Sequence, residues 1–503
     1  MNKRLLSVTF GLVLASPQVG TGQSAFYVQI NTNASNRDII GDAANEPSIA
    51  VDPNNPNRMA VGWRQFDTIS SNFRQAGVAY TTNGGMTWTS SVLTPGLMRS
   101  DPVLRPDPAG NFYYSSLSSP TSSEVFKSSD GGATWGPPIN SFGGDKEWIA
   151  IDNTNGPGRG NIYEDWNVQF SSVANSSFTR STNGGASFEN PTTGPNLLKW
   201  GTLAVGPNGT LYAAGSTLSQ TGHLLAVSTN AQFASQTPTF TSQTINLGGL
   251  TSPGNAAVNP DGLLGQVWVA TANNGNIYVL GSVDPPGTDP LDVMFIRSTN
   301  GGANWSSPIR INNNPVGENS YQWFGAMSVA PNGRIDAIWN DTGVNSSNQF
   351  SVLKYTYSFD SGLTWLGNIA LTPAFDHTIG YPSQNKIGDY YDIVSNNLGA
   401  NVVFSATFNG GQDVYYMRIT PVPGDWNGDG KVDAADYVKW RKDPTGNGGN
   451  PAGYDTWREN FGRGISGSGS GTLANGSVPE PTPLVLLLFA MTGWSLPRGR
   501  ITY

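Results

Sequence analysis

The chain has 503 residues, of which only 12% are charged, while 62 are glycine and 11% are aromatic. Few charges combined with many glycines and aromatics suit short strands joined by tight turns, and argue against a helical or disordered protein. The formal net charge of −8 argues against binding to nucleic acid, which depends on clustered lysine and arginine. Because the sequence contains no cysteine, disulfides, thiolate metal sites and a cysteine nucleophile are excluded.

The first 25 residues have the order of a secretion signal. Lys3 and Arg4 precede a short apolar run that begins at Leu5, and small residues follow around 20–25. This order predicts a Sec-type signal peptide over residues 1–25, the alternative being a buried N-terminal strand. The prediction makes this an exported protein.

One nine-residue pattern occurs five times in the body of the chain. In each copy Ser or Thr is followed two positions later by Asn or Asp, then by Gly and by Trp or Phe. The copies are YTTNGGMTW (80–88), KSSDGGATW (127–135), RSTNGGASF (180–188), RSTNGGANW (297–305) and YSFDSGLTW (357–365). The Asn or Asp side chain can bond backbone N–H groups just ahead of it, and the glycine supplies a positive φ. Each copy is therefore predicted to be a tight hairpin turn.

A second repeat precedes the turns, in which two apolar strands flank a Pro/Asn/Gly turn. It occurs seven times, at 45–63, 100–117, 145–166, 200–216, 265–282, 324–341 and 390–407. Adding the strands on either side of each nine-residue turn gives four strands per module. Repeated four-stranded antiparallel modules predict an all-β fold, a β-propeller over residues 26–422. The count is seven blades, with six as the alternative.

The seventh module has only three strands of its own, because strand 413–419 is followed directly by the next domain. The otherwise unassigned segment FYVQIN (26–31) is predicted to supply the fourth strand. Pairing the two ends in this way closes the ring and removes an exposed sheet edge.

The five turns resemble the Asp boxes (BNR repeats) of sialidases, and the resemblance covers most of the propeller region. It implies an arginine cluster for a substrate carboxylate, an aspartate acid/base, and a tyrosine nucleophile assisted by a glutamate. WRQFD (63–67) is similar to the sialidase strand that carries an active-site arginine and leads to the acid/base aspartate. The resemblance therefore implies these two roles for Arg64 and Asp67.

For the remaining roles, the resemblance implies Tyr390 or Tyr391 as the nucleophile and Glu147 or Glu164 as its helper. The chain departs from the sialidase pattern in two ways: NEPSI (45–49) stands where an Arg-Ile-Pro motif is expected, and seven blades replace six. Two hypotheses follow. The propeller binds or displays glycan or polysaccharide without chemistry, or it is an exo-sialidase or another glycoside hydrolase.

Polar and aromatic residues near the inner strands fit both hypotheses. Asp101, Asp145, Glu147 and Asp389 stand just before inner strands, where polar residues satisfy strand ends around a channel. Five tryptophans are placed either to face the channel and stack on sugar rings or to pack between blades: Trp63, Trp148, Trp166, Trp200 and Trp323.

An acidic loop follows the propeller region and leads into a helical pattern, within a predicted module at 423–463. Oxygen-bearing residues occupy loop positions 1, 3, 5, 7, 9 and 12: Asp425, Asn427, Asp429, Lys431 (through its carbonyl), Asp433 and Asp436. This ring of oxygens, with Gly430 at the sharp turn, predicts a Ca²⁺ site. The segment resembles a type I dockerin, an α-helical EF-hand-like module. Its second unit has Gly453 in the place of Asp436, so we expect one Ca²⁺ and no cohesin partner.

The last 40 residues also have features that indicate export. A Gly/Ser-rich linker (464–477) precedes a Val-Pro-Glu-Pro motif, a short apolar run and a basic tail within 478–503. This order resembles a PEP-CTERM sorting signal, which implies processing by an exosortase-type membrane enzyme and an envelope or extracellular location. The alternative is a plain membrane tail, since the apolar run is shorter than the ~20 residues that span a bilayer.

Overall fold

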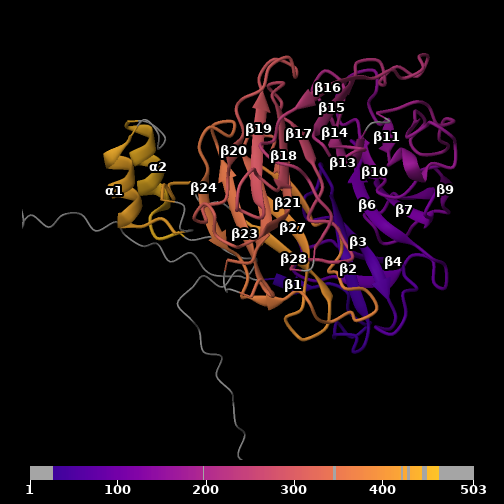
Figure 1. The fold of residues 1–503 in the computed structure, drawn as a ribbon, viewed down its shortest axis with the longest axis horizontal. Helices are drawn as coiled ribbons and strands as arrows, with labels where there is room; N and C mark the ends of the chain where they lie inside the picture. The colour runs from indigo at the N-terminus through magenta and orange to yellow at the C-terminus, as the bar shows by residue number, and fades with distance from the viewer. Residues whose placement is uncertain are drawn as a thin grey trace, which may run out of the picture.

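The computed structural model describes residues 27–463 apart from short gaps at 196–197, 256, 344–346, 421–422, 428–430 and 445–449. The predicted signal peptide, linker and sorting signal lie outside these residues. The described residues form seven β-sheets arranged in a ring, with two short helices beside them (Figure 1). In that part of the chain, neither helix has the length and apolar character needed to span a membrane. The predicted all-β propeller of seven blades is confirmed.

Each sheet is one blade, and in blades 1–6 the strands follow one another outward in chain order. Blade 1 comprises β2 (Ala43–Val51), β3 (Met59–Phe66), β4 (Gln75–Thr81) and β5 (Thr89–Val92). Blade 2 comprises β6 (Ser100–Pro106), β7 (Phe112–Ser119), β8 (Ser122–Ser128) and β9 (Ile139–Asn140). Blade 4 comprises β13 (Leu198–Val205), β14 (Leu211–Thr217), β15 (His223–Ser228) and β16 (Thr241–Ile245). Blade 5 comprises β17 (Trp268–Thr271), β18 (Ile277–Val283), β19 (Asp292–Ser298) and β20 (Ile309–Arg310).

Two blades depart from four strands. Blade 6 has a fifth: β21 (Gln322–Val329), β22 (Ile335–Asp341), β23 (Phe350–Ser358), β24 (Leu366–Ala370) and β25 (Phe375–Asp376). Blade 3 has three: β10 (Trp148–Ile151), β11 (Ile162–Asp165) and β12 (Phe178–Ser181), with a 3₁₀ turn at Val168–Phe170. The prediction of four strands in every module is therefore wrong for blade 3. Pro191 and Pro195 lie where the fourth strand would run, and proline has no N–H for the ladder, so one bridge, Phe178 to Thr192, replaces it.

The first strand of each blade lies innermost. These strands contact one another in the cyclic order β2, β6, β10, β13, β17, β21 and the first strand of blade 7, which returns to β2. Blade 7 comprises β26 (Asp392–Asn396), β27 (Gly399–Ala406), β28 (Asp413–Ile419) and β1 (Tyr27–Gln29). β1 pairs antiparallel with β28, Tyr27 opposite Met417 and Gln29 opposite Tyr415. The predicted closure by the N-terminal strand is therefore confirmed.

The Asp boxes join the third strand of a blade to the segment that follows, at the outer side of the ring. In the fifth box Ser358 Oγ accepts the Gly362 N–H at 2.9 Å, and Asp360 Oδ1 accepts the Thr364 N–H at 2.9 Å. The box glycine also meets the preceding blade. Gly85 has a φ of +88°, and a Cβ there would overlap the ring of Tyr416. The boxes are thus turn structures that also set the spacing between blades.

The helical module consists of α1 (Ala434–Lys442) and α2 (Ala452–Asn460). Asp433 caps α1 by accepting the Ala435 N–H at 2.7 Å, and Asp436 reciprocates by accepting the Asp433 N–H at 2.8 Å. Trp457 donates its indole N–H to the Asp433 carbonyl at 2.7 Å and packs on Val432. The module therefore has a small aromatic core of its own, and Figure 1 places it beside β24.

Candidate functional site at the channel mouth

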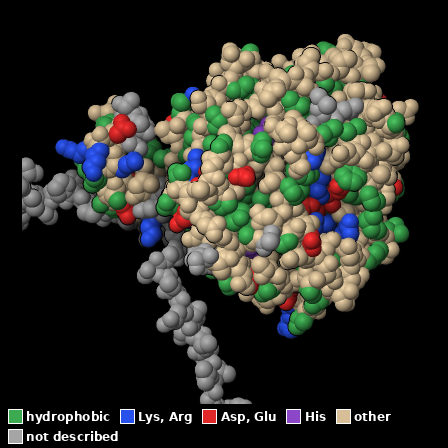
Figure 2. All heavy atoms as spheres, viewed as in Figure 1, with side chains coloured by type: hydrophobic (Ala, Val, Ile, Leu, Met, Phe, Trp, Pro, Cys, Tyr) green, Lys and Arg blue, Asp and Glu red, His purple; other side chains and the backbone are tan. Residues whose placement is uncertain are grey.

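Acidic and basic side chains gather at one end of the central channel. Figure 2 shows Lys/Arg and Asp/Glu side chains together in the middle of this propeller face. They line a recess of about 390 Å³ that includes Arg64, Asp101, Lys146, Trp200 and Asp389. These residues come from blades 1, 2, 3 and 4 and from the segment leading into blade 7. The recess is therefore built by the ring as a whole.

A shared backbone feature turns side chains toward the channel. Near the start of every innermost strand one residue has a positive φ: Glu46 (54°), Asp101 (48°), Lys146 (64°), Trp200 (57°), Gly265 (140°), Phe324 (58°) and Gly388 (105°). In four blades the pairing register shifts at that point, as in a β-bulge. Five of the seven are not glycine, although this conformation is strained for other residues. Strain repeated at one level of the ring indicates a functional or structural constraint there.

Lys146 is the centre of an ion-pair network. Its Nζ lies 2.6 Å from Asp101 Oδ2, 2.6 Å from Asp389 Oδ2 and 3.6 Å from Asp145 Oδ1. Lys386 Nζ lies 3.0 Å from the same Asp389 oxygen and 3.3 Å from Glu46 Oε1. One cation thus holds acids from three segments of the ring.

These contacts set the ionisation of the acids. Burial alone would raise the pKa of Asp101, but Lys146 and Arg64 hold that pKa well below its ordinary value. Lys146 and Lys386 lower the pKa of Asp389 in the same way, again against burial. Burial and two neighbouring aspartates raise the pKa of Glu46 to about 7, although Arg64 opposes the rise. The network at the recess therefore combines carboxylates with lowered pKa values and one fully buried acid, Glu46, whose pKa is raised.

Arg64 lies on β3, the second strand of blade 1, and lines the recess. Only 2% of its surface is exposed. Its Nε donates to Asn45 Oδ1 at 2.8 Å and lies 3.1 Å from Glu46 Oε2. Asp67 is exposed, follows the end of β3 and accepts the Gln75 side-chain amide at 2.7 Å. It lines a different cavity, together with Trp63, so the structure does not bring Asp67 and Arg64 into one pocket.

The two candidate tyrosines are buried, and both hydroxyls donate to backbone carbonyls. Tyr390 donates to the Pro102 carbonyl at 2.9 Å, and Tyr391 donates to the Ser405 carbonyl at 2.5 Å. Burial raises the pKa of both phenols. Tyr390 stands edge-on to Trp148 with ring centroids 5.5 Å apart, so it contributes to the packed floor beneath the recess.

The two candidate glutamates lie in blade 3 and are also buried. Neither carboxylate oxygen of Glu147 has a hydrogen-bond partner among the described residues, and burial raises its pKa well above the ordinary value. Glu164 accepts the hydroxyl of Ser123, and burial raises its pKa to about 7. The two acids influence each other electrostatically, but neither lines the recess.

The sequence did not single out Glu46, Lys146 or Lys386. A signal was nonetheless present, because Glu46 and Lys146 stand at the same place in their modules as Asp101, one or two residues before an apolar inner strand. The prediction that polar residues at these places lie around the channel is consistent with where Asp101, Asp145 and Asp389 are found.

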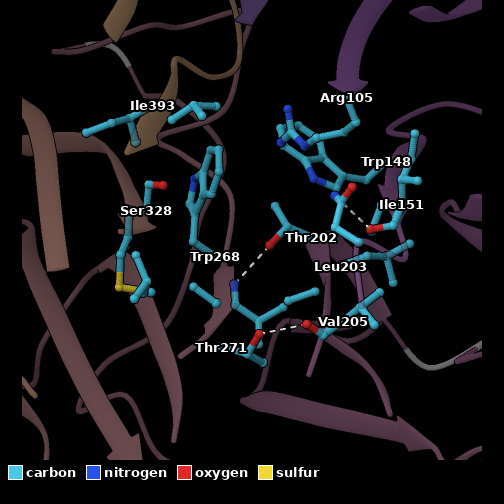
Figure 3. Close-up of a pocket in the computed structure, with 18 residues that line it drawn as sticks. Arg105, Trp148, Ile151, Thr202, Leu203, Val205, Trp268, Thr271, Ser328 and Ile393 are labelled. Carbon is cyan, nitrogen blue, oxygen red and sulfur yellow. Dashed lines mark hydrogen bonds between the residues drawn. The ribbon is translucent and has the colours of Figure 1, made fainter. Parts of the chain in front are cut away.

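A second cavity, of about 230 Å³, lies farther along the innermost strands (Figure 3). Trp148 and Trp268 meet edge-to-face, with ring centroids 5.2 Å apart. The Arg105 guanidinium lies 5.2 Å from the Trp148 ring centroid and 2.8 Å from Asp392 Oδ2. Trp148 lines this cavity, while Lys146 two residues earlier lines the recess. Aromatic packing therefore separates the two ends of the channel.

The predicted calcium loop lies in the helical module and is described in part. Asp429 and Gly430 fall outside the described residues. Asp425 and Asp436 are 2% and 0% exposed, and Asp436 Oδ1 accepts the Asn427 N–H at 2.9 Å. Both carboxylates thus lie in the loop where the sequence predicts oxygen ligands for a hard cation.

No protein-family profile matches the sequence, and no curated protein matches it. Solved structures of similar fold include the endosialidase of phage phi92, at 11% identity, 79% of this chain, 69% of that chain and TM-score 0.45. A leech intramolecular trans-sialidase is 11% identical over 69% of this chain and 71% of that one, with TM-score 0.43. A Dyadobacter fermentans protein of unknown function is 13% identical over 78% and 97%, with TM-score 0.44. Similarity at this level is confined to the propeller architecture.

Proposed function

We propose that the channel-mouth recess binds a glycan or polysaccharide without cleaving it. The observation that supports this is the convergence of half-exposed aromatic rings with both donors and acceptors. Trp200 and Phe170 are half-exposed at the recess, beside Lys199, Asp261 and Gln384. A concave site with an aromatic surface and a few convergent polar groups suits a sugar, whose C–H face stacks while its hydroxyls bond.

The burial of the reactive candidates favours binding over catalysis. The Tyr390 hydroxyl is hydrogen-bonded to a carbonyl, and Asp67 lies outside the recess. The Arg64 guanidinium is in contact with Glu46 and Asn45. These groups are engaged in structure. Trp200 and Lys199 are partly exposed and Asp261 is exposed, and all three line the recess.

Glycoside hydrolysis is the second candidate, and one observation favours it. Glu46 has its pKa raised to about 7, while the pKa of neighbouring Asp101 is lowered, and oxygens of both lie within 4.8 Å. Two carboxylates whose pKa values are driven apart can serve as acid and base. Glu46 has no exposed surface, so a substrate would have to displace its neighbours to reach it.

The proposal places this propeller at the cell surface or outside the cell. The signal peptide, the dockerin-like loop for one Ca²⁺ and the sorting signal for an exosortase-type enzyme, all predicted from the sequence, support that location. In this arrangement the propeller is displayed outside the cell and binds glycan there.

The test measures binding to a panel of soluble polysaccharides by affinity electrophoresis, with fluorogenic glycosides, including a sialoside, as a second arm. Trp200→Ala is expected to weaken binding about tenfold or more, as for a central aromatic contact. Phe359→Ala removes an exposed ring outside the recess and is the matched control. Fluorophore release that Glu46→Gln or Asp67→Asn abolishes would establish the hydrolase instead. Equal binding by Trp200→Ala and wild type would place the site elsewhere.

A further inference from the structure

A second acidic cluster lies where the ring closes. Oxygens of Asp38, Asp42 and Asp413 all lie within 4.8 Å of one another. Asp413 begins β28 of blade 7, Asp42 immediately precedes β2 of blade 1, and Asp38 lies in the segment between β1 and β2. We call these three residues the closure cluster. It joins the N-terminal segment to the two blades that meet at the closure.

No basic side chain in the described part of the chain pairs with the closure cluster. Among those residues, every ion pair within 4 Å involves other carboxylates. Side-chain amides, rather than lysines or arginines, contact these carboxylates. Asn31 Nδ2 donates to Asp413 Oδ1 at 2.7 Å, and Gln65 Nε2 donates to Asp42 Oδ2 at 2.8 Å. Gln29 Nε2 donates to Asp38 Oδ1 at 2.8 Å. These donors fix the carboxylates in place without neutralising their charge.

One oxygen of the closure cluster remains without a partner. Asp413 is 1% exposed, and its Oδ2 has no hydrogen-bond partner among the described residues. A buried carboxylate oxygen without a hydrogen-bond donor is unfavourable unless a cation or a proton lies beside it.

The chemistry of the side chains indicates the class of cation. Oxygens of the three carboxylates lie within 4.8 Å of one another, close enough to bind one hard cation. Carboxylates supplemented by amide or backbone oxygens are the ligands that Ca²⁺ prefers.

We propose that Asp38, Asp42 and Asp413 form a Ca²⁺ site that fastens the propeller at its closure, separate from the predicted loop in the helical module. The ion supplies the positive charge that the amides do not. Because its ligands come from blade 7, blade 1 and the N-terminal segment, its binding free energy stabilises the closed ring. Burial raises the pKa of Asp42 to about 7 and of Asp413 to about 6, in keeping with acids that lack a cation.

The experiment compares thermal unfolding of the propeller, followed by near-ultraviolet circular dichroism, in EDTA and in about 1 mM Ca²⁺, where extracellular calcium modules bind. For wild type we expect Ca²⁺ to raise the unfolding midpoint by about 3 °C. Asp413→Asn should abolish that rise and lower the calorimetric Ca²⁺ stoichiometry by one. The matched control, Asp425→Asn in the helical module, should keep the rise.

Asp413→Asn is expected to fold in EDTA, because it removes a buried charge. Asp38 is exposed, so Asp38→Asn provides a second variant that should weaken the Ca²⁺ effect without disturbing the core. An equal rise in wild type and both variants would overturn the proposal. So would the absence of any Ca²⁺ effect in wild type together with a loss of stability above pH ~6, which would mean that the cluster holds a proton.

Discussion

The propeller contains two clusters of three acids, and the two clusters differ in the groups that contact the carboxylates. At the channel mouth, Glu46, Asp101 and Asp389 have oxygens within 4.8 Å, as the closure cluster does. The channel-mouth acids are paired with Lys146 and Lys386. Among the described residues, the closure cluster has amide donors alone.

The pKa values follow this difference. With lysines beside them, Asp101 and Asp389 have lowered pKa values despite complete burial. With amides beside them, Asp42 and Asp413 have raised pKa values because burial dominates. Amides orient a carboxylate but leave its charge uncompensated, so an acid cluster without lysines is a candidate ion site and one with lysines is not.

Replacing Lys146 should make the channel-mouth cluster resemble the closure cluster, whose acids have no lysine partner. Lys146→Met leaves the buried Asp101 without its lysine and the buried Asp389 with Lys386 alone, and we expect the free energy of unfolding to fall by about 3–5 kcal/mol. Urea unfolding at neutral pH measures this loss. Methionine preserves the length of the side chain, so the change is mainly one of charge.

Lys127→Met is the matched control, because Lys127 is exposed and its Nζ donates to one carbonyl at 3.2 Å. It should cost no more than about 1 kcal/mol. Adding Asp101→Asn to Lys146→Met should recover part of the loss. Equal stability of Lys146→Met and Lys127→Met would mean that the ion-pair network does not compensate the negative charge of these acids.

The second prediction is that the contributions of the two clusters to stability depend differently on pH. In EDTA, folded Asp42 with a pKa of about 7 retains a proton that an unfolded aspartate, at about 3.9, has released. Its contribution to stability is therefore fully present below about pH 4, falls as the pH rises and is lost by about pH 7. Asp42→Asn cannot ionise, so it should gain about 2–3 kcal/mol on wild type between pH ~5 and pH ~8.

Asp101→Asn is the comparison for this series. The pKa of Asp101 is lowered, so this acid is ionised in both folded and unfolded chains throughout the range. Its replacement should therefore cost nearly the same free energy at both pH values. Parallel pH profiles for wild type and Asp42→Asn would show that the closure acids are compensated after all.

The repeats predicted the architecture because they are local. The hydrogen bonds of an Asp box join residues at most a few positions apart, as between Asp360 and Thr364, so the sequence pattern contains the whole structure. The closure by Tyr27–Gln29 was predictable by counting strands, since one blade had too few and one segment was unassigned. The missing strand of blade 3 depends on Pro191 and Pro195, whose effect on pairing the apolar pattern did not reveal.

The candidate site was less predictable because it depends on distant residues. Lys146 meets Asp389 across 243 positions of sequence, and Glu46 meets Lys386 across 340. The positive φ of Glu46 and Asp101 could not be predicted from the sequence either, because these residue types usually avoid that conformation. Resemblance placed Arg64 at the recess but paired it with Asp67, which the end of β3 carries to another pocket.

The smallest expected effect on the free energy of unfolding is that of Asp67→Asn. Because Asp67 is exposed, this variant is a reference for both acid clusters. Its carboxylate is exposed and accepts one amide hydrogen bond, from Gln75 at 2.7 Å. Asp67→Asn should therefore change the free energy of unfolding by about 0.5 kcal/mol or less, with no dependence on Ca²⁺. Urea unfolding with and without Ca²⁺ measures both quantities, and polysaccharide binding should equal that of wild type. A loss of binding or of glycoside cleavage in this variant would return Asp67 to the acid/base role that its resemblance implies, and would mean that a ligand joins the two pockets that the free protein keeps apart.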